Sequence, residues 1–192
     1  MANTEHGLPA VSNDPRFPQS GAAVDLLFAS MGRDELEELQ SLENLLQGIP
    51  LFQQIIDAMP IRVSVLNEKG QVVLMNRQYC RAQETNMECA VGKRHGELLC
   101  CIHSEKGPEG CGTSRECERC GAAVSIAASL QSKGQAIREY RLTRQTPDGP
   151  ETVDWIVAST PFWVDDRGFV IFAVQDMNPQ RVRDSLLLES KD

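Results

Sequence analysis

Seven cysteines between residues 80 and 120 constrain this 192-residue chain more than any other feature of its sequence. They are Cys80, Cys89, Cys100, Cys101, Cys111, Cys117 and Cys120. An odd number of cysteines disfavours a disulfide framework, and the first residues show neither the basic nor the apolar region of a secretory signal. Clustered cysteines in a reducing compartment more often bind a metal. The sequence therefore predicts a cytoplasmic protein with a metal site.

Four of these cysteines have the compact spacing C-x9-C-x5-C-x2-C. They are Cys101, Cys111, Cys117 and Cys120. Gly121 follows the last pair and lets the chain turn and direct amides at the sulfurs, while Gly110 and Gly112 let the backbone approach a metal. Four thiolates suit tetrahedral Zn²⁺ or an iron–sulfur cluster, so these four cysteines are the predicted metal ligands.

The remaining cysteines and one histidine leave alternatives open. Cys100 could replace Cys101 as a ligand, and His103 is a second possible substitute. Cys80 is expected to be a small buried apolar residue, and Cys89 an ordinary loop thiol.

Composition excludes two classes of partner. Nineteen Lys and Arg against 27 Asp and Glu give a net charge of −8, whereas a nucleic-acid-binding protein gathers basic residues on one face. No apolar run approaches the roughly 20 residues that span a bilayer. Neither nucleic acid nor membrane is an expected partner.

Periodicity divides the chain into four parts. Residues 1–21 are expected to form a disordered tail, residues 22–50 an N-terminal helix, residues 51–178 a folded domain with its cysteine cluster at 100–121, and residues 179–192 a C-terminal helix. Within them the pattern predicts helices at 36–49, 51–59, 122–130 and 181–188. Strands are predicted at 61–67, 71–76, 136–145, 151–163 and 169–177. This order predicts an α+β fold, a five-stranded antiparallel sheet with helices on one face.

The order of elements and several short motifs resemble a PAS domain over roughly Leu51 to Asn178. The matching stretches are 55–60, 65–76, 139–142, 159–162, 165–171 and 174–177. The resemblance implies a sensory and dimerisation module that holds small ligands between its sheet and its middle helices. The cysteine-rich middle segment departs from the family and resembles a metal-binding subgroup from bacterial signalling proteins, often found beside kinase domains.

These observations predict a sensor that detects redox state, a metal or a small ligand and relays it through its flanking helices. The expected partners are a signalling protein such as a kinase or regulator and a second copy of the chain. The second copy is expected to bind the apolar stripe of the helix at 36–49, which consists of Leu36, Leu39, Leu42, Leu45, Leu46 and Ile49. The alternative is an adaptor in which zinc only stabilises the loop. No enzyme is expected, because Cys101 with His103 is the one nearby thiol–base pair and no third group orients it.

The identity of the metal stays open between two choices. The C-x2-C-G pattern in a loop without other structure favours zinc, because a metal can close a loop that has no core of its own. A position where PAS domains line their ligand pocket favours a redox-responsive iron–sulfur cluster. Zinc is the expected cofactor and the cluster is the alternative.

Overall fold

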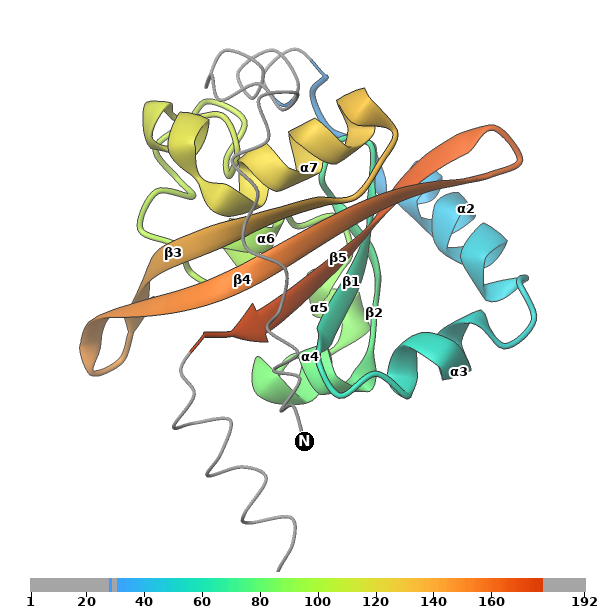
Figure 1. Ribbon diagram of the computed structural model, residues 1–192, viewed down its shortest axis with the longest axis horizontal. Helices are drawn as coiled ribbons and strands as arrows, with labels where there is room; N and C mark the ends of the chain where they lie inside the picture. The colour runs from blue at the N-terminus through green and yellow to red at the C-terminus, as the bar shows by residue number, and fades with distance from the viewer. Residues whose placement is uncertain (1–27, 29–30, 178–192) are drawn as a thin grey trace, which may run out of the picture.

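The computed structural model describes residue 28 and residues 31–177, and a five-stranded antiparallel sheet of order β2-β1-β5-β4-β3 forms its centre (Figure 1). The strands are β1 Arg62–Asn67, β2 Val72–Met75, β3 Ala136–Thr146, β4 Gly149–Val164 and β5 Arg167–Asp176. The helices are α2 Leu36–Gln47, α3 Phe52–Asp57, α4 Arg77–Ala82, α5 Met87–Ala90, α6 His95–Leu98, the 3₁₀ helix η1 Arg115–Arg119 and α7 Gly121–Ser132. The predicted α+β class and five-stranded antiparallel sheet are confirmed.

The three long strands form a meander with tight turns. Asp165 and Asp166 connect β4 to β5, and their φ angles of 47° and 64° are those of a type I′ turn, whose twist matches that of the two strands. Strand β1 then pairs with β5, and β2 with β1. Strands β2 and β3 form the two opposite edges of the sheet, so the cysteine-rich segment that connects them has to cross one face of the sheet.

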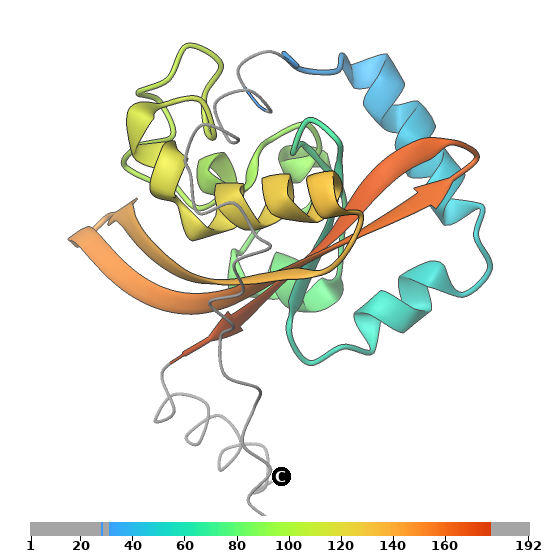
Figure 2. The same cartoon turned by 45° about the horizontal axis from the view of Figure 1, so that its top comes forward.

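Helix α7 and the short helices of residues 77–98 cover the face that the cysteine-rich segment crosses, called the inner face below (Figure 2). Ala122 and Ile126 of α7 pack in one buried cluster with Tyr140, Trp155 and Phe172 of the sheet. A side chain at position 121 would collide with the backbone of β3, so glycine there permits α7 to lie directly on the sheet. This close packing fixes the start of α7, where Cys120 is located.

The opposite face of the sheet carries α2, which belongs to the N-terminal helical extension expected from the sequence. Leu39, Leu42 and Leu46 are 2%, 5% and 0% exposed and pack in a second cluster with Val65 of β1 and Phe169 of β5. The stripe expected to mediate dimerisation is therefore used inside the chain, because burying apolar side chains against the sheet removes them from water.

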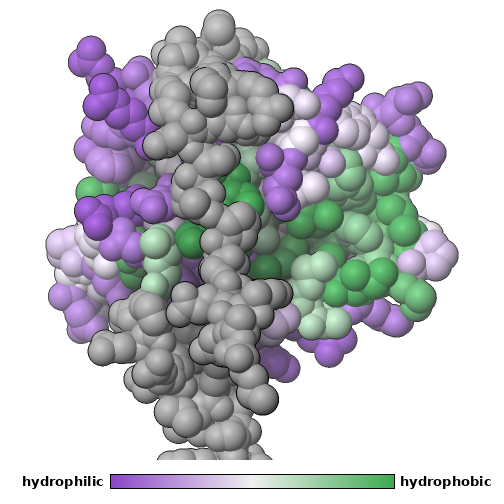
Figure 3. Space-filling model, in the orientation of Figure 1, coloured by the Kyte–Doolittle hydropathy of each residue, from purple (hydrophilic) through white to green (hydrophobic). Residues whose placement is uncertain are grey.

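Apolar surface nevertheless remains where α2, α3 and the β4–β5 turn lie, as the green region of Figure 3 shows. The strongly exposed apolar side chains of these elements are Leu36, Leu51, Ile55 and Trp163. A homodimer stays a prediction, and its interface is not the buried side of α2.

The predicted tail at 1–21 and the predicted helix at 181–188 lie outside the described residues. Within the part of the chain that the structure describes, none of the helices has the length and apolar character required to cross a bilayer.

Candidate metal centre

The four predicted ligands line one cavity of about 340 Å³ between the cysteine-rich segment and the inner face of the sheet. Cys101 follows α6, and a β-bridge to Arg144 places it beside β3. Cys111 lies in the loop before η1, Cys117 lies in η1, and Cys120 precedes the first residue of α7. The fold thus places these four cysteines, which span twenty positions of the sequence, around the same cavity.

The four sulfurs share this cavity without being gathered around a single point. Among residues 28 and 31–177, no three His, Cys, Asp or Glu side chains are placed to hold one metal ion together. Zinc binds thiolates at about 2.3 Å. Metal binding would therefore require the cysteines to close towards one another.

Cys117 has the most polar surroundings of the four. Its sulfur accepts a hydrogen bond from the Gly112 amide at 3.3 Å and contacts the Ser114 hydroxyl at 3.2 Å. A hydrogen bond from the Cys111 thiol is the largest of the influences that lower the pKa of Cys117 to about 5. Cys117 is therefore a thiolate at neutral pH, the form that binds metals.

The other three sulfurs are protonated at neutral pH. The hydrogen bond that Cys111 donates to Cys117, followed by burial, raises the pKa of Cys111 well above its usual value. Burial is the main cause for the remaining two, and it raises the pKa of Cys101 and brings that of Cys120 to about 11. Binding through all four thiolates would release the protons of these three thiols.

Backbone amides near the sulfurs fit a thiolate-bound metal. The amides of residues 103 and 104 lower the pKa of Cys101, that of residue 96 lowers the pKa of Cys111, and those of residues 122 and 123 lower the pKa of Cys120, in each case against the effect of burial. Each of these amides favours the charged thiolate. Amides directed at the sulfurs were expected around Cys120, and the amide hydrogen bond found among the described residues is that of Gly112 to Cys117.

The two possible substitutes have different positions. His103 lines the same cavity, and its Nδ1 atom is buried without a hydrogen-bond partner, so it is available as a fifth donor. Cys100 is exposed and is not part of the cavity wall. Cys89 is also exposed, and Cys80 packs partly buried against the inner core, as their sequence contexts suggested.

Sequence reasoning missed His95, which is buried beside this cavity. Its Nδ1 atom lies 2.8 Å from the Tyr79 hydroxyl, and rings of Phe172, Tyr140 and Trp155 surround it. Burial lowers the pKa of His95 to about 3, so the imidazole is neutral, and its Nε2 atom has no hydrogen-bond partner. No local pattern in the sequence distinguishes this histidine, since its surroundings come from three separate strands.

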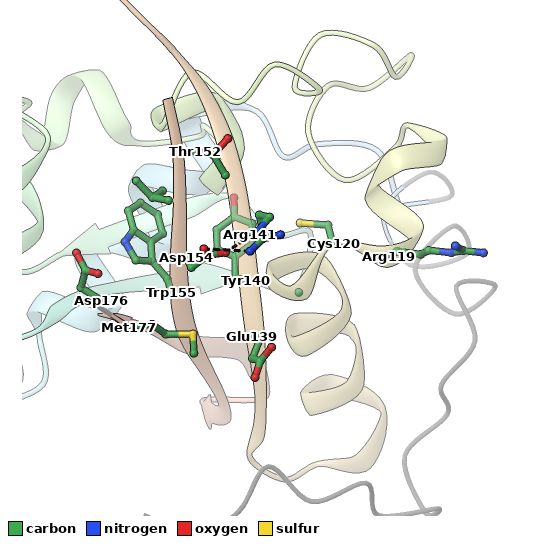
Figure 4. A pocket seen from close by; sticks show the side chains of 12 residues that line it. Arg119, Cys120, Glu139, Tyr140, Arg141, Thr152, Asp154, Trp155, Asp176 and Met177 are labelled. Atoms are coloured by element: carbon green, nitrogen blue, oxygen red, sulfur yellow. Dashed lines mark hydrogen bonds and ion pairs between the residues drawn. The ribbon is translucent and has the colours of Figure 1, made fainter. Parts of the chain in front are cut away.

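A surface groove adjoins the cavity and shares part of its wall. The groove, of about 780 Å³, is lined by charged residues of β3 and β4, including Arg141 and Asp154, which form an ion pair at 2.7 Å. Figure 4 shows the Cys120 side chain directed from the start of α7 towards Tyr140 and Arg141 of β3. Cys120 and Tyr140 line both spaces, so the candidate centre adjoins the protein surface on this side.

Comparisons with known proteins give likeness of structure only. No family model and no curated protein match the sequence. Among solved structures, a PAS domain of an HTR-like protein from Haloarcula marismortui is 13% identical over 72% of this chain and 98% of its own, with a TM-score of 0.44. The PAS domain of nitrogen regulation protein NR(II) from Vibrio parahaemolyticus is 11% identical over 65% and 96%, at 0.47. A Rhodobacter sphaeroides LOV protein is 12% identical over 73% and 69%, at 0.46. At these values the description of the fold rests on the strand order above.

Proposed function

We propose that the chain is a sensory module of the PAS type that binds a metal through the thiolates of its compact cysteine set. The proposed ligands are Cys101, Cys111, Cys117 and Cys120, with His103 as a possible substitute. Zinc is the proposed metal and an iron–sulfur cluster is the alternative. The convergence of all four cysteines on one cavity is the observation that carries this proposal.

The chain's own residues would perform three tasks in such a centre. The amides around the sulfurs offset negative charge, which four thiolates and one divalent ion leave in excess. Cys101, beside β3, and Cys120, at the start of α7, attach the centre to the core. Cys111 and Cys117 come from the loop and from η1, so the metal would tie an irregular segment to a rigid frame.

The proposed output is transmission through the flanking segments to a cytoplasmic signalling partner, such as a kinase or regulator, in a homodimer. The chain is not proposed to be an enzyme. If the metal only staples the loop, the module is instead an adaptor. A sensor changes conformation with the state of the metal, whereas a stapled loop only loses stability when the metal is removed.

Metal and acid-labile sulfide analysis of protein purified without oxygen tests the centre. We expect about one zinc per chain, no sulfide and no visible absorbance. Iron with matching sulfide and a brown colour would identify the cluster instead. Replacing Cys117→Ser and Cys120→Ser together is expected to abolish binding, because it removes two of four thiolates.

The double variant Cys89→Ser with Cys100→Ser is the matched control. It also removes two thiols, but both are exposed and neither lines the cavity. We expect its metal content to equal that of the unmodified protein. Loss of metal in the control, or unchanged metal in the Cys117→Ser, Cys120→Ser variant, would show that the ligands are wrongly assigned.

A further inference from the structure

Cys111 is held from both sides by charged side chains that also bind the N-terminal segment, defined here as residue 28 with residues 31–34. Its amide donates to Glu97 at 3.0 Å, and its carbonyl oxygen accepts from Arg94 at 3.0 Å. A loop residue with no helix or strand of its own is therefore fixed by two contacts to α6 and the residue before it.

Arg94 is the first of the two links. It is only 2% exposed, and its guanidinium donates to backbone carbonyl oxygens at 2.8–3.5 Å. These acceptors belong to Lys69, Glu109, Cys111, Phe28 and Gly32. A buried guanidinium is costly unless its N–H groups are satisfied. Because the acceptors come from separate segments, loss of any one of those segments leaves Arg94 donors unsatisfied.

Glu97 is the second link. Its carboxylate accepts from the Cys111 amide and forms an ion pair with Arg33 of the N-terminal segment. Arg33 also donates to the carbonyl oxygen of Glu109 at 2.9 Å, two residues before Cys111. The same arginine therefore binds both the carboxylate that holds Cys111 and the loop that carries it.

The glycines beside Cys111 allow the N-terminal segment to approach closely. Gly110 and Gly112 have φ angles of +81° and +91°. A Cβ atom at 110 would collide with Glu97 and Arg33, and one at 112 would lie 3.2 Å from the ring of Phe28. The glycines therefore admit the N-terminal segment, and Phe28 itself is buried and lines the cysteine cavity.

We propose that Arg94, Glu97 and Arg33 form a conformational latch that couples Cys111 to the N-terminal segment and so to α2. A change that moves Cys111 alters both of its backbone contacts and, with them, the bonds that hold residues 28 and 31–34. The coupling is reciprocal, so releasing the segment also exposes Cys111. The part of the proposal that concerns metal rests on the proposed function; the reciprocal part does not.

The reciprocal part is tested by thiol alkylation of metal-free full-length protein, read for each cysteine by mass spectrometry. Replacing Arg33→Gln removes the ion pair with Glu97 at a partly exposed position. We expect the alkylation rate of Cys111 to rise about tenfold, while that of Cys101 stays unchanged. If Arg33→Gln does not fold, Phe28→Ala removes the contact with Gly112 and carries the same expectation.

Arg167→Gln is the matched control. Like Arg33, Arg167 is a partly exposed arginine in an ion pair, but its partner is Glu38 of α2 and neither residue belongs to the cysteine-rich segment. This substitution removes an ion pair of α2 but leaves the contacts of Arg33, Arg94 and Glu97 in place, so the rate at Cys111 should not change. Equal Cys111 rates in Arg33→Gln and the unmodified protein would overturn the latch, and so would an equal increase in the Arg167→Gln control.

The metal part is tested by amide hydrogen exchange over residues 31–47, with and without Zn²⁺. We expect zinc to slow exchange there about tenfold in the unmodified protein and much less in Arg33→Gln. Bound zinc without any change over 31–47 would overturn the latch and leave the proposed metal centre intact. Failure to bind zinc or to contain a cluster would refute the centre, and alkylation of Cys111 would then decide the latch alone.

Discussion

His95 shows how a single side chain can make stability depend on pH. Burial lowers its pKa to about 3, whereas an unfolded histidine has a pKa near 6.5. Between these values the unfolded chain binds a proton that the folded chain does not. The stabilising contribution of a neutral His95 is therefore complete above about pH 6.5 and is lost as the pH falls towards 3.

Replacing His95→Gln is expected to remove this dependence. Glutamine stays neutral and keeps an acceptor within reach of the Tyr79 hydroxyl. In the unmodified protein this hydroxyl lies 2.8 Å from the Nδ1 atom of His95. Urea unfolding in the presence of a chelator should show the unmodified protein losing about 3 kcal/mol more stability than the variant between pH 7 and pH 4.5. Parallel curves for the two proteins would contradict this, because they would show that the folded chain binds a proton at His95 as readily as the unfolded chain does.

Residue spacing identified the cysteines that share the cavity but not the groups around them. The C-x9-C-x5-C-x2-C pattern is local, so it can be recognised without a fold. The environment of His95 and the contacts of Arg94 involve residues far apart in the sequence, such as Phe172 and Gly32, and no local pattern encodes them. The glycines beside Cys111 were recognised as special, but their reason was visible only once Phe28 and Arg33 were placed.

At the scale of elements, α2 stands out because its leucines form part of the core. Leu46 is fully buried in the cluster between α2 and the sheet, whereas Leu36, the first residue of the same helix, is 59% exposed. Replacing Leu46→Ala should lower the free energy of unfolding by about 2–5 kcal/mol, since it removes buried methyl groups and leaves a cavity. Leu36→Ala, the matched control, should change it by about 0.5 kcal/mol or less. Urea denaturation measures both, and equal effects would contradict the packing of α2 on the sheet.

Periodicity gave most element positions, because alternation and helical spacing report directly which side of an element is apolar. The predicted helix at 36–49 and strand at 136–145 correspond to α2 and β3 within a few residues. Periodicity does not say what covers an apolar stripe. The leucines of α2 are equally compatible with a partner helix and with the outer face of the sheet, and only the strand order shows that the chain itself has a face to cover.

For the whole molecule, this use of α2 changes where a homodimer would form. The apolar side chains left exposed near α2 and α3 include Leu51 and Ile55, at 61% and 56%. Isolated exposed apolar residues are common, but contiguous apolar surface, as in Figure 3, is typical of interaction sites. We therefore expect the dimer predicted from the sequence to bury these side chains rather than Leu39, Leu42 and Leu46.

Light scattering of the full-length chain at about 50 μM tests this interface, because assembly depends on concentration. We expect a dimer for the unmodified protein and a monomer for the double variant Leu51→Glu with Ile55→Glu, since two buried unpaired carboxylates would oppose association. Ile137→Glu, on the edge strand β3, offers the comparison, because Ile137 is 40% exposed but belongs to another element. Dissociation by Ile137→Glu alone would place the interface on the strands. A monomeric unmodified protein would contradict the predicted dimer, and the latch would then act within a single chain.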